Sequence, residues 1–560
     1  MNRIAIFHKL IDRREEKMIE ENFVGLIEKS IRENWTSSAL ADYEGEDYTY
    51  GEVAGTIKKL HRLFKKIEIQ ENDKIAAIGN NSVNWAIVYL AVVTYGGIVV
   101  PILPDFHLKD KEHILKHSDS TILFADEDQY EQLETEYIDQ MKAIISLQDF
   151  NCLYCRDKSY SEKIKQIVDE EVKLLPEDFG LPNISNEDVA SITYTSGTTG
   201  FSKGVVLTHN NYAANLVYAF ENVYLESGDT ILSFLPLAHT FGCAFEFLFP
   251  FCRGAFITFL HKIPSPRIIL EAFDRIKPNL ILSVPLILEK IYNKKIKPAL
   301  NKQPTKSMLM IPGLKNVVQK NIREKLRDSF GGEFKEIIIG GAPLNNEVEK
   351  FLMEIDFPFT VGYGVTECAP LISYAGWKER KYKGSGTPVD TLDVKIDSEN
   401  PHSEPGEVLV KGDNVFKGYY KNEEQTQDSF QNGWYRTGDL AIIDEEGHLF
   451  IKGRCKNMIL GPAGENIFPE EIEFKINNKP YVEESLVIER ESNIVALVYP
   501  DYEKMDEEEI TQKTMEEKIE DIRAEINREL PQYSKINKME LYPEEFEKTP
   551  TKKIKRYLYK

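Results

Sequence analysis

The chain has 560 residues, of which 69 are Lys or Arg and 91 are Asp or Glu, so its formal charge at pH 7 is −22. Apolar residues make up 42% and charged residues 29%, a composition that excludes disordered and collagen-like proteins. At about 150 residues per domain, the length allows three or four structural units. The acidic balance excludes nucleic acid as the main partner, because phosphate backbones bind basic faces. An anionic ligand must therefore be held by a local site.

The N-terminal half predicts an α/β protein, because helix-like and strand-like segments alternate from about residue 20 to residue 190. The first segments are Asp73–Ile78 (strand), Ser82–Tyr95 (helix), Ile98–Pro101 (strand) and Lys109–Lys116 (helix). The alternation resumes between Asn211 and Tyr363 with Thr230–Leu235 (strand), Pro266–Ile276 (helix) and Leu280–Val284 (strand). Lys294–Asn316 interrupts it with prolines and lysines, which indicates an inserted, mobile segment.

From about Gly384 the pattern changes to a β-rich portion that extends to about residue 450. Its short strands are predicted at Asp393–Asp397, Gly406–Lys411 and Ala441–Ile443, with a hairpin turn at Asp444–Gly447. The charged run Asp501–Glu529 predicts one solvated amphipathic helix.

The sequence predicts a cytoplasmic protein. Charged residues at positions 13–17 interrupt the only early apolar stretch, which argues against a signal peptide. The uncharged stretch Ala86–Leu103 is broken by Gly96, Gly97 and Pro101, so it predicts a helix, a turn and a strand instead of a membrane span. Peripheral contact with the inner face of a membrane stays open as an alternative.

The cysteines and paired histidines predict no metal or redox site. Six cysteines are too few for a disulfide scaffold and suit a reducing compartment. Cys152 and Cys155 form one CxxC, with no second pair to complete a zinc site. His113 and His117 lack the intervening glutamate of an HExxH helix, so solvated or core histidines are expected.

The strongest local signal is the run Thr195-Ser-Gly-Thr-Thr-Gly-Phe-Ser-Lys-Gly204, which follows an apolar strand. Glycines let backbone N–H groups face a ligand, hydroxyls add donors, and a lysine neutralises charge, so the run predicts a phosphate-binding loop. Its spacing differs from a Walker A loop, because no Gly-Lys-Ser/Thr follows the second glycine. The alternative is an ordinary hairpin turn.

This run resembles the AMP-binding signature of the adenylate-forming superfamily, which includes acyl-CoA synthetases, luciferases and peptide-synthetase adenylation domains. Further segments resemble the superfamily's motifs in their family order: Leu235–Gly242 (acyl site), Gly340–Pro343 (adenine turn), Gly362–Glu367 (nucleotide), Tyr435–Asp439 (ribose), Gly453–Lys456 (hinge), Gly464–Glu473 and Thr549–Arg556 (terminal lysine). The segments Leu235–Gly242, Val284–Tyr292 and Gly461–Pro469 are most similar to the long-chain fatty acyl-CoA synthetase branch.

The resemblance implies an α/β fold with a large N-terminal region, residues 1–455, that includes the β-rich portion. A small, mobile α+β domain, residues 456–560, follows a hinge at Lys456. The implied reaction is an ATP- and Mg²⁺-dependent ligation of a fatty acid or related carboxylate to CoA through acyl-AMP. An acyl-carrier-protein ligase and a ligase for another acid remain open alternatives, and so does a homodimer. A non-catalytic nucleotide sensor would not need Lys553, Glu367 and the hinge.

The resemblance also implies individual roles. The nucleotide-binding residues are Thr195, Ser196, Gly197, Thr198, Thr199, Gly200, Lys203, Gly341, Ala342, Pro343, Gly362, Tyr363, Gly364, Thr366, Asp439 and Arg454. The catalytic residues are Lys553, Thr366 and Glu367, with Glu367 as the Mg²⁺ ligand. His239 would border the acyl pocket, and Gly464 would line the CoA tunnel, where a side chain would obstruct passage.

Several of these positions have plain structural alternatives. Tyr363 could stack on adenine or be a core tyrosine, Asp439 could bind ribose hydroxyls or form a turn, and Arg454 could be limited to a salt bridge. The aromatic run 243–251 could flank an acyl tunnel or be buried core. A cation at Lys553 would stabilise charge at the α-phosphate, whereas a basic tail would contact solvent or lipid headgroups. Lys552 stands where the family has glycine, so Lys552 could share the role.

Overall fold

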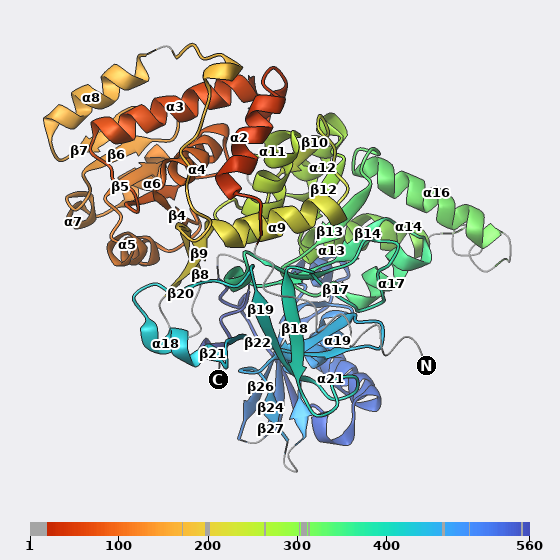
Figure 1. Cartoon of the computed structure of the whole chain (residues 1–560). Coiled ribbons are helices and arrows are strands. Elements are labelled where there is room, and N and C mark those ends of the chain that lie inside the picture. Colours follow the sequence, from red (N-terminus) through yellow and green to blue (C-terminus); the bar gives the residue numbers. More distant parts are fainter. Residues whose placement is uncertain are drawn as a thin grey trace, which may run out of the picture.

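Two mixed, largely parallel β-sheets form the large N-terminal region of the computed structural model (Figure 1). The structure describes residues 19–170, 172–195, 202–261, 265–301, 303, 311, 314–461, 465–491, 493–549 and 553–559. The eight-stranded sheet has the spatial order β20 (Gly418–Tyr419), β9 (Lys203–Thr208), β8 (Val189–Thr195), β4 (Ile98–Ile102), β3 (Lys74–Ile78), β5 (Ile122–Ala125), β6 (Ala143–Ser146) and β7 (Cys152–Cys155). The seven-stranded sheet has the order β14 (Phe359–Val361), β13 (Glu336–Ile339), β12 (Leu280–Ser283), β10 (Thr230–Ser233), β11 (Phe256–Phe259), β1 (Ser38–Asp42) and β2 (Asp47–Thr49).

Helices pack on these sheets. The first group is α2 (Phe23–Glu33), α3 (Tyr50–Lys66), α4 (Val83–Tyr95), α5 (Leu108–His117), α6 (Glu127–Gln132), α7 (Thr135–Ile138), α8 (Lys158–Val168) and α9 (His209–Asn222). The second group is α10 (Thr240–Gly242), α11 (Phe249–Arg253), α12 (Pro266–Ile276), α13 (Pro285–Ile291), α14 (Lys297–Asn301), α16 (Leu314–Ser329) and α17 (Asn346–Glu354). The predicted alternation of helices and strands is confirmed.

Smaller sheets form the β-rich portion, where the strands are antiparallel, and the C-terminal region, where β27 and β28 pair in parallel. The β-rich strands are β15 (Tyr363–Gly364), β16 (Leu371–Tyr374), β17 (Thr387–Pro388), β18 (Leu392–Asp397), β19 (Gly406–Gly412), β21 (Phe430–Gln431), β22 (Trp434–Ile443) and β23 (Leu449–Arg454), with α18 (Glu423–Asp428). The C-terminal elements are β24 (Ile459–Leu460), β25 (Asn466–Ile467), α19 (Pro469–Asn477), β26 (Val482–Arg490), β27 (Asn493–Pro500), α20 (Tyr502–Glu507), α21 (Gln512–Glu529) and β28 (Lys538–Leu541). The predicted hairpin at Asp444–Gly447 joins β22 to β23.

The uncharged stretch Ala86–Leu103 folds as predicted, into helix α4, a turn and strand β4. The Ser82 side chain caps α4 by accepting from the N–H of Trp85, and Gly96 ends it with a φ of 89°, a conformation that glycine adopts at no steric cost. The helix is apolar on all sides because it is buried within the protein. Among the described residues, no helix is long and apolar enough to cross a bilayer.

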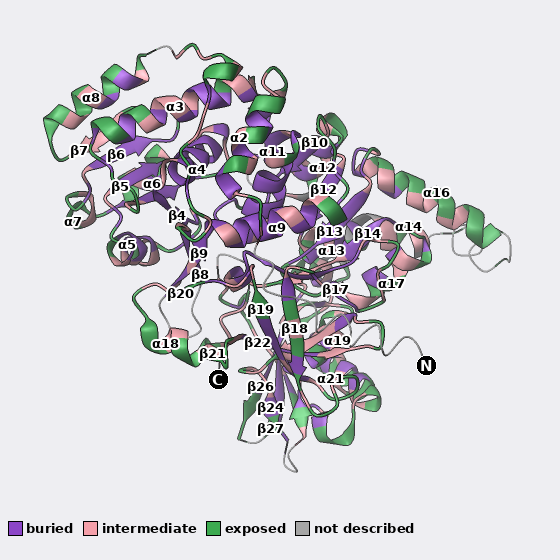
Figure 2. Cartoon of the chain, viewed as in Figure 1, coloured by how far each residue is buried: buried purple, intermediate pink, exposed green. Residues whose placement is uncertain are grey.

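The N-terminal region and the C-terminal region have separate hydrophobic cores. One core extends from Phe23 to Leu449 and joins both large sheets to the β-rich portion, and Figure 2 shows its strands as buried. Two smaller clusters lie within residues 459–546. The predicted fold class, a large α/β region with a β-rich portion and a smaller α+β domain, is confirmed.

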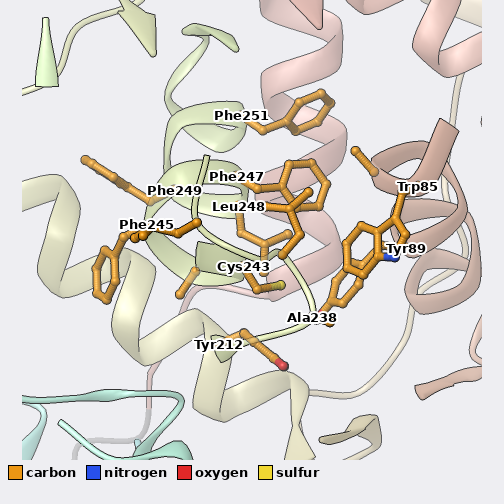
Figure 3. Packing of buried hydrophobic residues seen from close by; sticks show 14 of the residues in the cluster. Trp85, Tyr89, Tyr212, Ala238, Cys243, Phe245, Phe247, Leu248, Phe249 and Phe251 are labelled. Atoms are coloured by element: carbon orange, nitrogen blue, oxygen red, sulfur yellow. The ribbon is translucent and has the colours of Figure 1, made fainter. Parts of the chain in front are cut away.

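The aromatic run 243–251 lies in the large core. Cys243–Leu248 forms a π-helix that continues into α11, and Phe247, Phe249 and Phe251 are fully buried. Figure 3 shows Phe247 on the side of Trp85 and Tyr89 of α4, and the ring centres of Phe247 and Tyr89 lie 5.9 Å apart. The core interpretation of this run therefore accounts for its aromatic composition.

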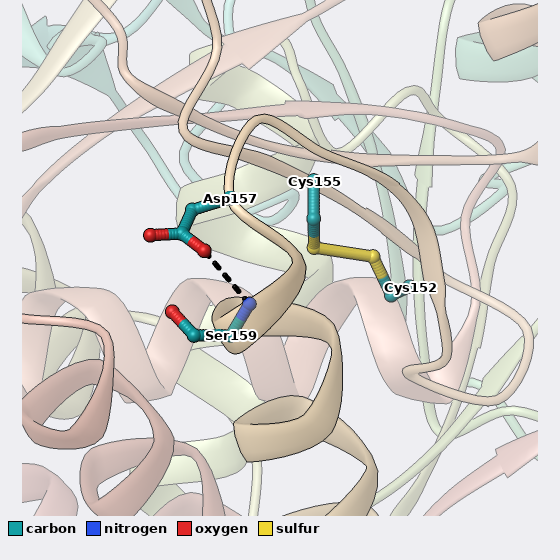
Figure 4. Close-up of a disulfide and its surroundings, with 4 residues drawn as sticks. All are labelled: Cys152, Cys155, Asp157 and Ser159. Atoms are coloured by element: carbon teal, nitrogen blue, oxygen red, sulfur yellow. Dashed lines mark hydrogen bonds between the residues drawn. A yellow bond between two sulfur atoms is a disulfide. The ribbon is translucent and has the colours of Figure 1, made fainter.

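Three sequence expectations need correction. The charged run Asp501–Glu529 forms two helices, α20 and α21, because Thr511 caps a new helix by accepting from the N–H of Thr514. Part of the segment Lys294–Asn316 is helical, in α14 and the start of α16, while residues 302, 304–310 and 312–313 lie outside the described residues. Cys152 and Cys155 form a disulfide at the edge strand β7 (Figure 4), which the low cysteine content did not predict.

Candidate active site

The centre of the candidate site is Asp439, on β22, which pairs with Arg454 across the β22–β23 ladder. The Arg454 Nε lies 3.1 Å from the Asp439 Oδ1, and the Tyr363 hydroxyl donates to Oδ2 at 2.9 Å. Asp439 is only 5% exposed, and this burial raises the pKa of its carboxyl, while Arg454 and the Tyr363 hydroxyl act in the opposite direction. A buried carboxylate with an arginine beside it can accept hydrogen bonds from hydroxyl groups of a ligand.

Tyr363 and Glu367 lie on opposite ends of one short segment that begins with β15. Gly364 between them has no room for a side chain, because a Cβ there would collide with the carbonyl oxygen of Pro370. Thr366 and Glu367 lie in a single 3₁₀ turn, where Thr366 is nearly buried. The Tyr419 hydroxyl donates to the Glu367 Oε1 at 2.8 Å and so fixes the carboxylate.

The predicted phosphate loop connects two paired strands. Thr195 ends β8 and faces Lys203, which begins β9, so the loop starts and ends at neighbouring residues of one hairpin. Ser196, Gly197, Thr198, Thr199 and Gly200 lie outside the described residues. The Lys203 Nζ lies 5.4 Å from the centre of the Tyr419 ring. Burial lowers the pKa of Lys203, the charge of Lys456 acts in the same direction, and Glu367 opposes both.

Lys553 belongs to the C-terminal region but lies close to the residues of the N-terminal region. Burial of its ammonium lowers the pKa of Lys553, as does the charge of Arg454, whereas Asp439 and Glu367 raise it. Lys553 as a whole residue is exposed, whereas its ammonium, which carries the charge, lies among these charged groups. A tight loop holds Lys553: its carbonyl accepts from the N–H of Thr549 at 2.7 Å, and its N–H donates to the Thr549 hydroxyl at 3.2 Å. Lys552 lies outside the described residues.

The predicted acyl-site segment approaches the adenine turn. The ring of Phe241, on α10, lies against Gly340, where a Cβ would be 2.9 Å from the ring. His239 precedes α10, and its Nδ1 accepts from the N–H of Phe241 at 3.3 Å. Burial and then the charge of Lys553 lower the pKa of His239 to about 4, so the imidazole is neutral at pH 7.

A buried glutamate, Glu246, holds the segment that leads to His239. Its Oε2 accepts from the N–H of Phe234 at 3.0 Å, the N–H of Leu235 at 2.8 Å and the hydroxyl of Ser233 at 3.1 Å. Burial raises the pKa of Glu246 above its usual range, and the hydrogen bonds from Leu235, Ser233 and Phe234 act in the opposite direction.

The remaining predicted residues belong to the segments that follow β13, precede β15 and follow β23. Gly341, Ala342 and Pro343 form an exposed turn after β13, which Gly341 makes possible with a φ of 86°. Gly362 directly precedes β15. Lys456 lines a cavity of about 150 Å³ between the end of β23 and strand β26. Gly464 lies outside the described residues.

The sequence did not identify several residues that organise the site. Tyr419 binds the Glu367 carboxylate, and Glu470 accepts from the Asn457 side chain at 2.6 Å, next to the predicted hinge. Arg556 and Glu473 form an ion pair beside the Lys553 loop. Arg556 and Glu473 stood inside segments that resembled family motifs, but nothing in their local sequence indicated that they contact each other.

The described residues fit a magnesium ion only together with a ligand that supplies further oxygens. Among them, no group of three or more His, Cys, Asp and Glu side chains could hold a metal. Glu367 provides one carboxylate, and phosphate oxygens could complete the shell that Mg²⁺ requires.

Comparisons with known proteins agree with this arrangement. The family model described as AMP-binding enzyme matches residues 27–420, and a model of the AMP-binding enzyme C-terminal domain matches residues 456–559. The long-chain-fatty-acid–CoA ligase FadD15 of Mycobacterium bovis is 27% identical, over 92% of this chain and 91% of the relative. Long-chain-fatty-acid–CoA ligase 4 of Saccharomyces cerevisiae is 28% identical, over 88% of this chain and 77% of the relative.

Two solved structures show the same fold. ATP-bound MatB from Rhodopseudomonas palustris superposes with a TM-score of 0.76 and 21% identity, covering 96% of this chain and 98% of that one. The o-succinylbenzoate CoA synthetase MenE from Bacillus subtilis, in complex with its acyl-adenylate, superposes with a TM-score of 0.75 and 21% identity, covering 98% and 99%. The family resemblance predicted from the motifs is confirmed: this chain belongs to the AMP-binding enzyme family.

Proposed function

We propose that this protein is an ATP-dependent fatty acid:CoA ligase that forms an acyl-AMP and then a thioester. The observation that carries the proposal is the position of Lys553, a cation from the C-terminal region that lies within electrostatic range of Glu367, Asp439 and Arg454. In this proposal, the residues that bind the nucleotide and the cation that acts on its α-phosphate lie in one site.

In the first step, a carboxylate oxygen of the acid attacks the α-phosphorus of ATP, and the bond from that phosphorus to the bridging oxygen breaks, releasing pyrophosphate. Negative charge accumulates on the non-bridging oxygens of the α-phosphate. The Lys553 ammonium stabilises that charge, and Lys203 and the hydroxyls of the Thr195–Gly200 loop bind the departing phosphates. Glu367 and Thr366 would hold Mg²⁺ and a phosphate oxygen, and Mg²⁺ supplies charge neutralisation on the phosphates.

The remaining residues bind and orient the nucleotide. Asp439 accepts from the ribose hydroxyls, with Arg454 and Tyr363 holding its carboxylate in place. The Tyr363 ring and the turn Gly341–Pro343 contact adenine, where the exposed glycine backbone permits close approach. His239 forms a neutral wall of the acyl pocket, consistent with its low pKa.

In the second step, the CoA thiol attacks the acyl carbonyl, AMP leaves, and the thiol proton passes to solvent. We infer that the domain after residue 455 turns about Lys456 between the steps and removes Lys553 from the site. The separate hydrophobic cores on the two sides of this boundary, and the family model that begins at residue 456, support a division there. Gly464 would then line the passage for the thiol.

A long-chain fatty acid is the proposed substrate, because the relatives that match most of this chain are named as ligases of such acids. Pyrophosphate release from ATP, measured across acids of C2 to C18 with CoA or acyl carrier protein, tests this assignment. Turnover should be highest with long-chain acids and CoA. Activity confined to acetate or aromatic acids would refute the substrate assignment, and a strict requirement for carrier protein would replace CoA as the acceptor.

A further inference from the structure

The segment from Lys290 to Arg327 has a charge opposite to that of the whole chain. It contains eleven Lys and Arg residues and one acidic residue, Glu324, so its formal charge is +10 in a chain of −22. An excess of this size in 38 residues is a local cationic region on an otherwise acidic protein.

The same segment exposes aliphatic side chains. Ile311, Leu314 and Val317 are 47%, 42% and 55% exposed, respectively. They are three of the seven large aliphatic side chains that are exposed in the described part of the chain. Scattered exposed apolar residues are ordinary, but three within seven positions form a patch, and such patches mark interaction sites.

Helix α16 presents this patch away from the body of the protein. Its C-terminal part is anchored, since Leu326 is buried and Arg323 forms an ion pair with Asp356 at 3.1 Å. Its N-terminal turn, residues 314–317, is exposed at every position. In Figure 1 the helix extends from the large region toward the edge of the molecule, and Figure 2 shows no buried residue along its outer part.

Lysines flank the apolar patch. Lys315 and Lys320 are exposed, and within the described residues Lys315 has no ion-pair partner. Lys320 lies 3.8 Å from Glu324, an exposed pair that competes weakly with another anion. The patch and these lysines, Ile311, Leu314, Lys315, Val317 and Lys320, are called the α16 surface below.

We propose that the α16 surface docks on an anionic lipid bilayer. Aliphatic side chains enter the boundary between headgroups and acyl chains, and lysines bind the lipid phosphates. The rest of the chain is acidic and is repelled by such a membrane, so this charge distribution favours the orientation with the α16 surface toward the bilayer. A nucleic acid would not require the aliphatic side chains. The inference deepens the proposed function and rests on it in one respect: a ligase of long-chain acids would meet its substrate in a bilayer.

Vesicle binding tests the proposal without relying on catalysis. Full-length protein is sedimented with vesicles of phosphatidylcholine alone, or with about 30% phosphatidylglycerol, at about 50 mM and about 300 mM NaCl. Binding should require the anionic lipid and weaken roughly tenfold at the higher salt, because the lysine contacts are screened. The double variants Lys315→Glu/Lys320→Glu and Leu314→Ser/Val317→Ser should each weaken binding roughly tenfold or more.

Lys65→Glu/Lys66→Glu, at the end of α3, is the matched control: it changes the net charge by the same amount at exposed positions far from α16 in Figure 1. Equal loss of binding in this control, no binding by the unchanged protein, or equal binding to neutral vesicles would overturn the proposal. Octanoate turnover without vesicles should be unchanged in all three variants. If turnover is normal while vesicle binding is absent, the membrane inference is wrong and the proposed ligase function stands.

Discussion

Arg556, three residues beyond Lys553 in the chain, forms an ion pair with the buried carboxylate of Glu473. The Arg556 Nη1 also donates to the carbonyl of Val487 at 3.3 Å, and the N–H of Val487 donates to the Glu473 Oε1 at 2.6 Å. These contacts attach the terminal segment to α19 and β26. The loop that carries Lys553 is therefore attached to the body of the C-terminal region.

Arg556→Met should destabilise the C-terminal region by about 3–5 kcal/mol at pH 8, because it leaves a buried carboxylate without its partner. Burial raises the pKa of Glu473 to about 7 in the folded protein, even with Arg556 beside it, from an ordinary value of 4.5. A raised pKa means that the folded state binds the proton more tightly, so stability contributed by this group falls as the pH rises through 4.5 to 7.

Without Arg556, the pKa of Glu473 should rise further, and the cost of the substitution should shrink at pH 6. Urea unfolding at pH 6 and pH 8 measures this difference. Arg490→Met is the control, since Arg490 pairs with the exposed side of Glu540 at 3.2 Å and should contribute about 0–1 kcal/mol. If Arg556 positions the Lys553 loop, adenylation should be slower in Arg556→Met and partly restored in Arg556→Lys. A loss of stability in Arg556→Met that does not depend on pH would contradict the burial argument.

Lys553→Ala should slow adenylation by about 10²–10³-fold, equivalent to about 2.7–4 kcal/mol, by analogy with removal of an oxyanion donor. Thioester formation from supplied acyl-adenylate and CoA should stay near normal, because the proposed mechanism uses the lysine in the first step alone. Single-turnover measurements of each step separate the two. Lys552→Ala tests which of the two lysines acts: if Lys552→Ala is the impaired variant, the catalytic lysine is Lys552. Equal loss of both steps in Lys553→Ala would refute domain alternation.

The alkaline limit of adenylation should report Lys553. Burial and Arg454 lower the pKa of this lysine below 10.5, so it loses its charge at a lower pH than a free lysine as the pH rises. In kcat/KM for ATP, which reflects the free enzyme, activity should therefore fall on the alkaline side. Lys553→Arg should be slower at neutral pH but should lack this fall, since arginine stays charged. An identical alkaline fall in both proteins would assign it to another group.

Asp439→Asn should raise the KM for ATP, because a charged hydrogen-bonding partner is worth about 1.5–3 kcal/mol. Tyr363→Phe is the informative companion, since it removes the hydroxyl that donates to Asp439 at 2.9 Å but keeps the ring that would stack on adenine. Its KM should rise by less than that of Asp439→Asn. An unchanged ATP dependence in Asp439→Asn would remove this residue from the ribose role.

Glu246→Gln should leave stability nearly unchanged, whereas Glu246→Ala should cost several kcal/mol. Burial raises the pKa of Glu246 and so disfavours its charged form, which a neutral amide lacks, and glutamine still provides an acceptor for the N–H groups of Phe234 and Leu235. Alanine leaves those donors buried without a partner, at about 1–3 kcal/mol each. Thermal unfolding of both variants measures the contrast. A large loss in Glu246→Gln would indicate that the carboxyl is ionised.

Local sequence was sufficient to predict the elements whose cause is local. Helix α12 begins and ends where the sequence predicted, because Ser265 caps it and Pro266 starts it. Gly96 ends α4 because a left-handed turn is needed there, and Asp444–Gly447 forms its hairpin from turn residues alone. The run Thr195–Gly204 likewise predicted a loop rich in hydrogen-bond donors, although its central residues lie outside the described part of the chain.

The tertiary structure decided which of these residues meet. Asp439 and Arg454 face each other because β22 pairs with β23, and Lys553 reaches them from a different hydrophobic core. The contacts of Glu473 with Arg556, 83 residues apart, and of Glu367 with Tyr419, 52 apart, depend on long-range packing that no local pattern encodes. The charge of the segment 290–327 was readable in the sequence, but only the fold shows that its aliphatic side chains remain uncovered, because burial depends on what packs against them.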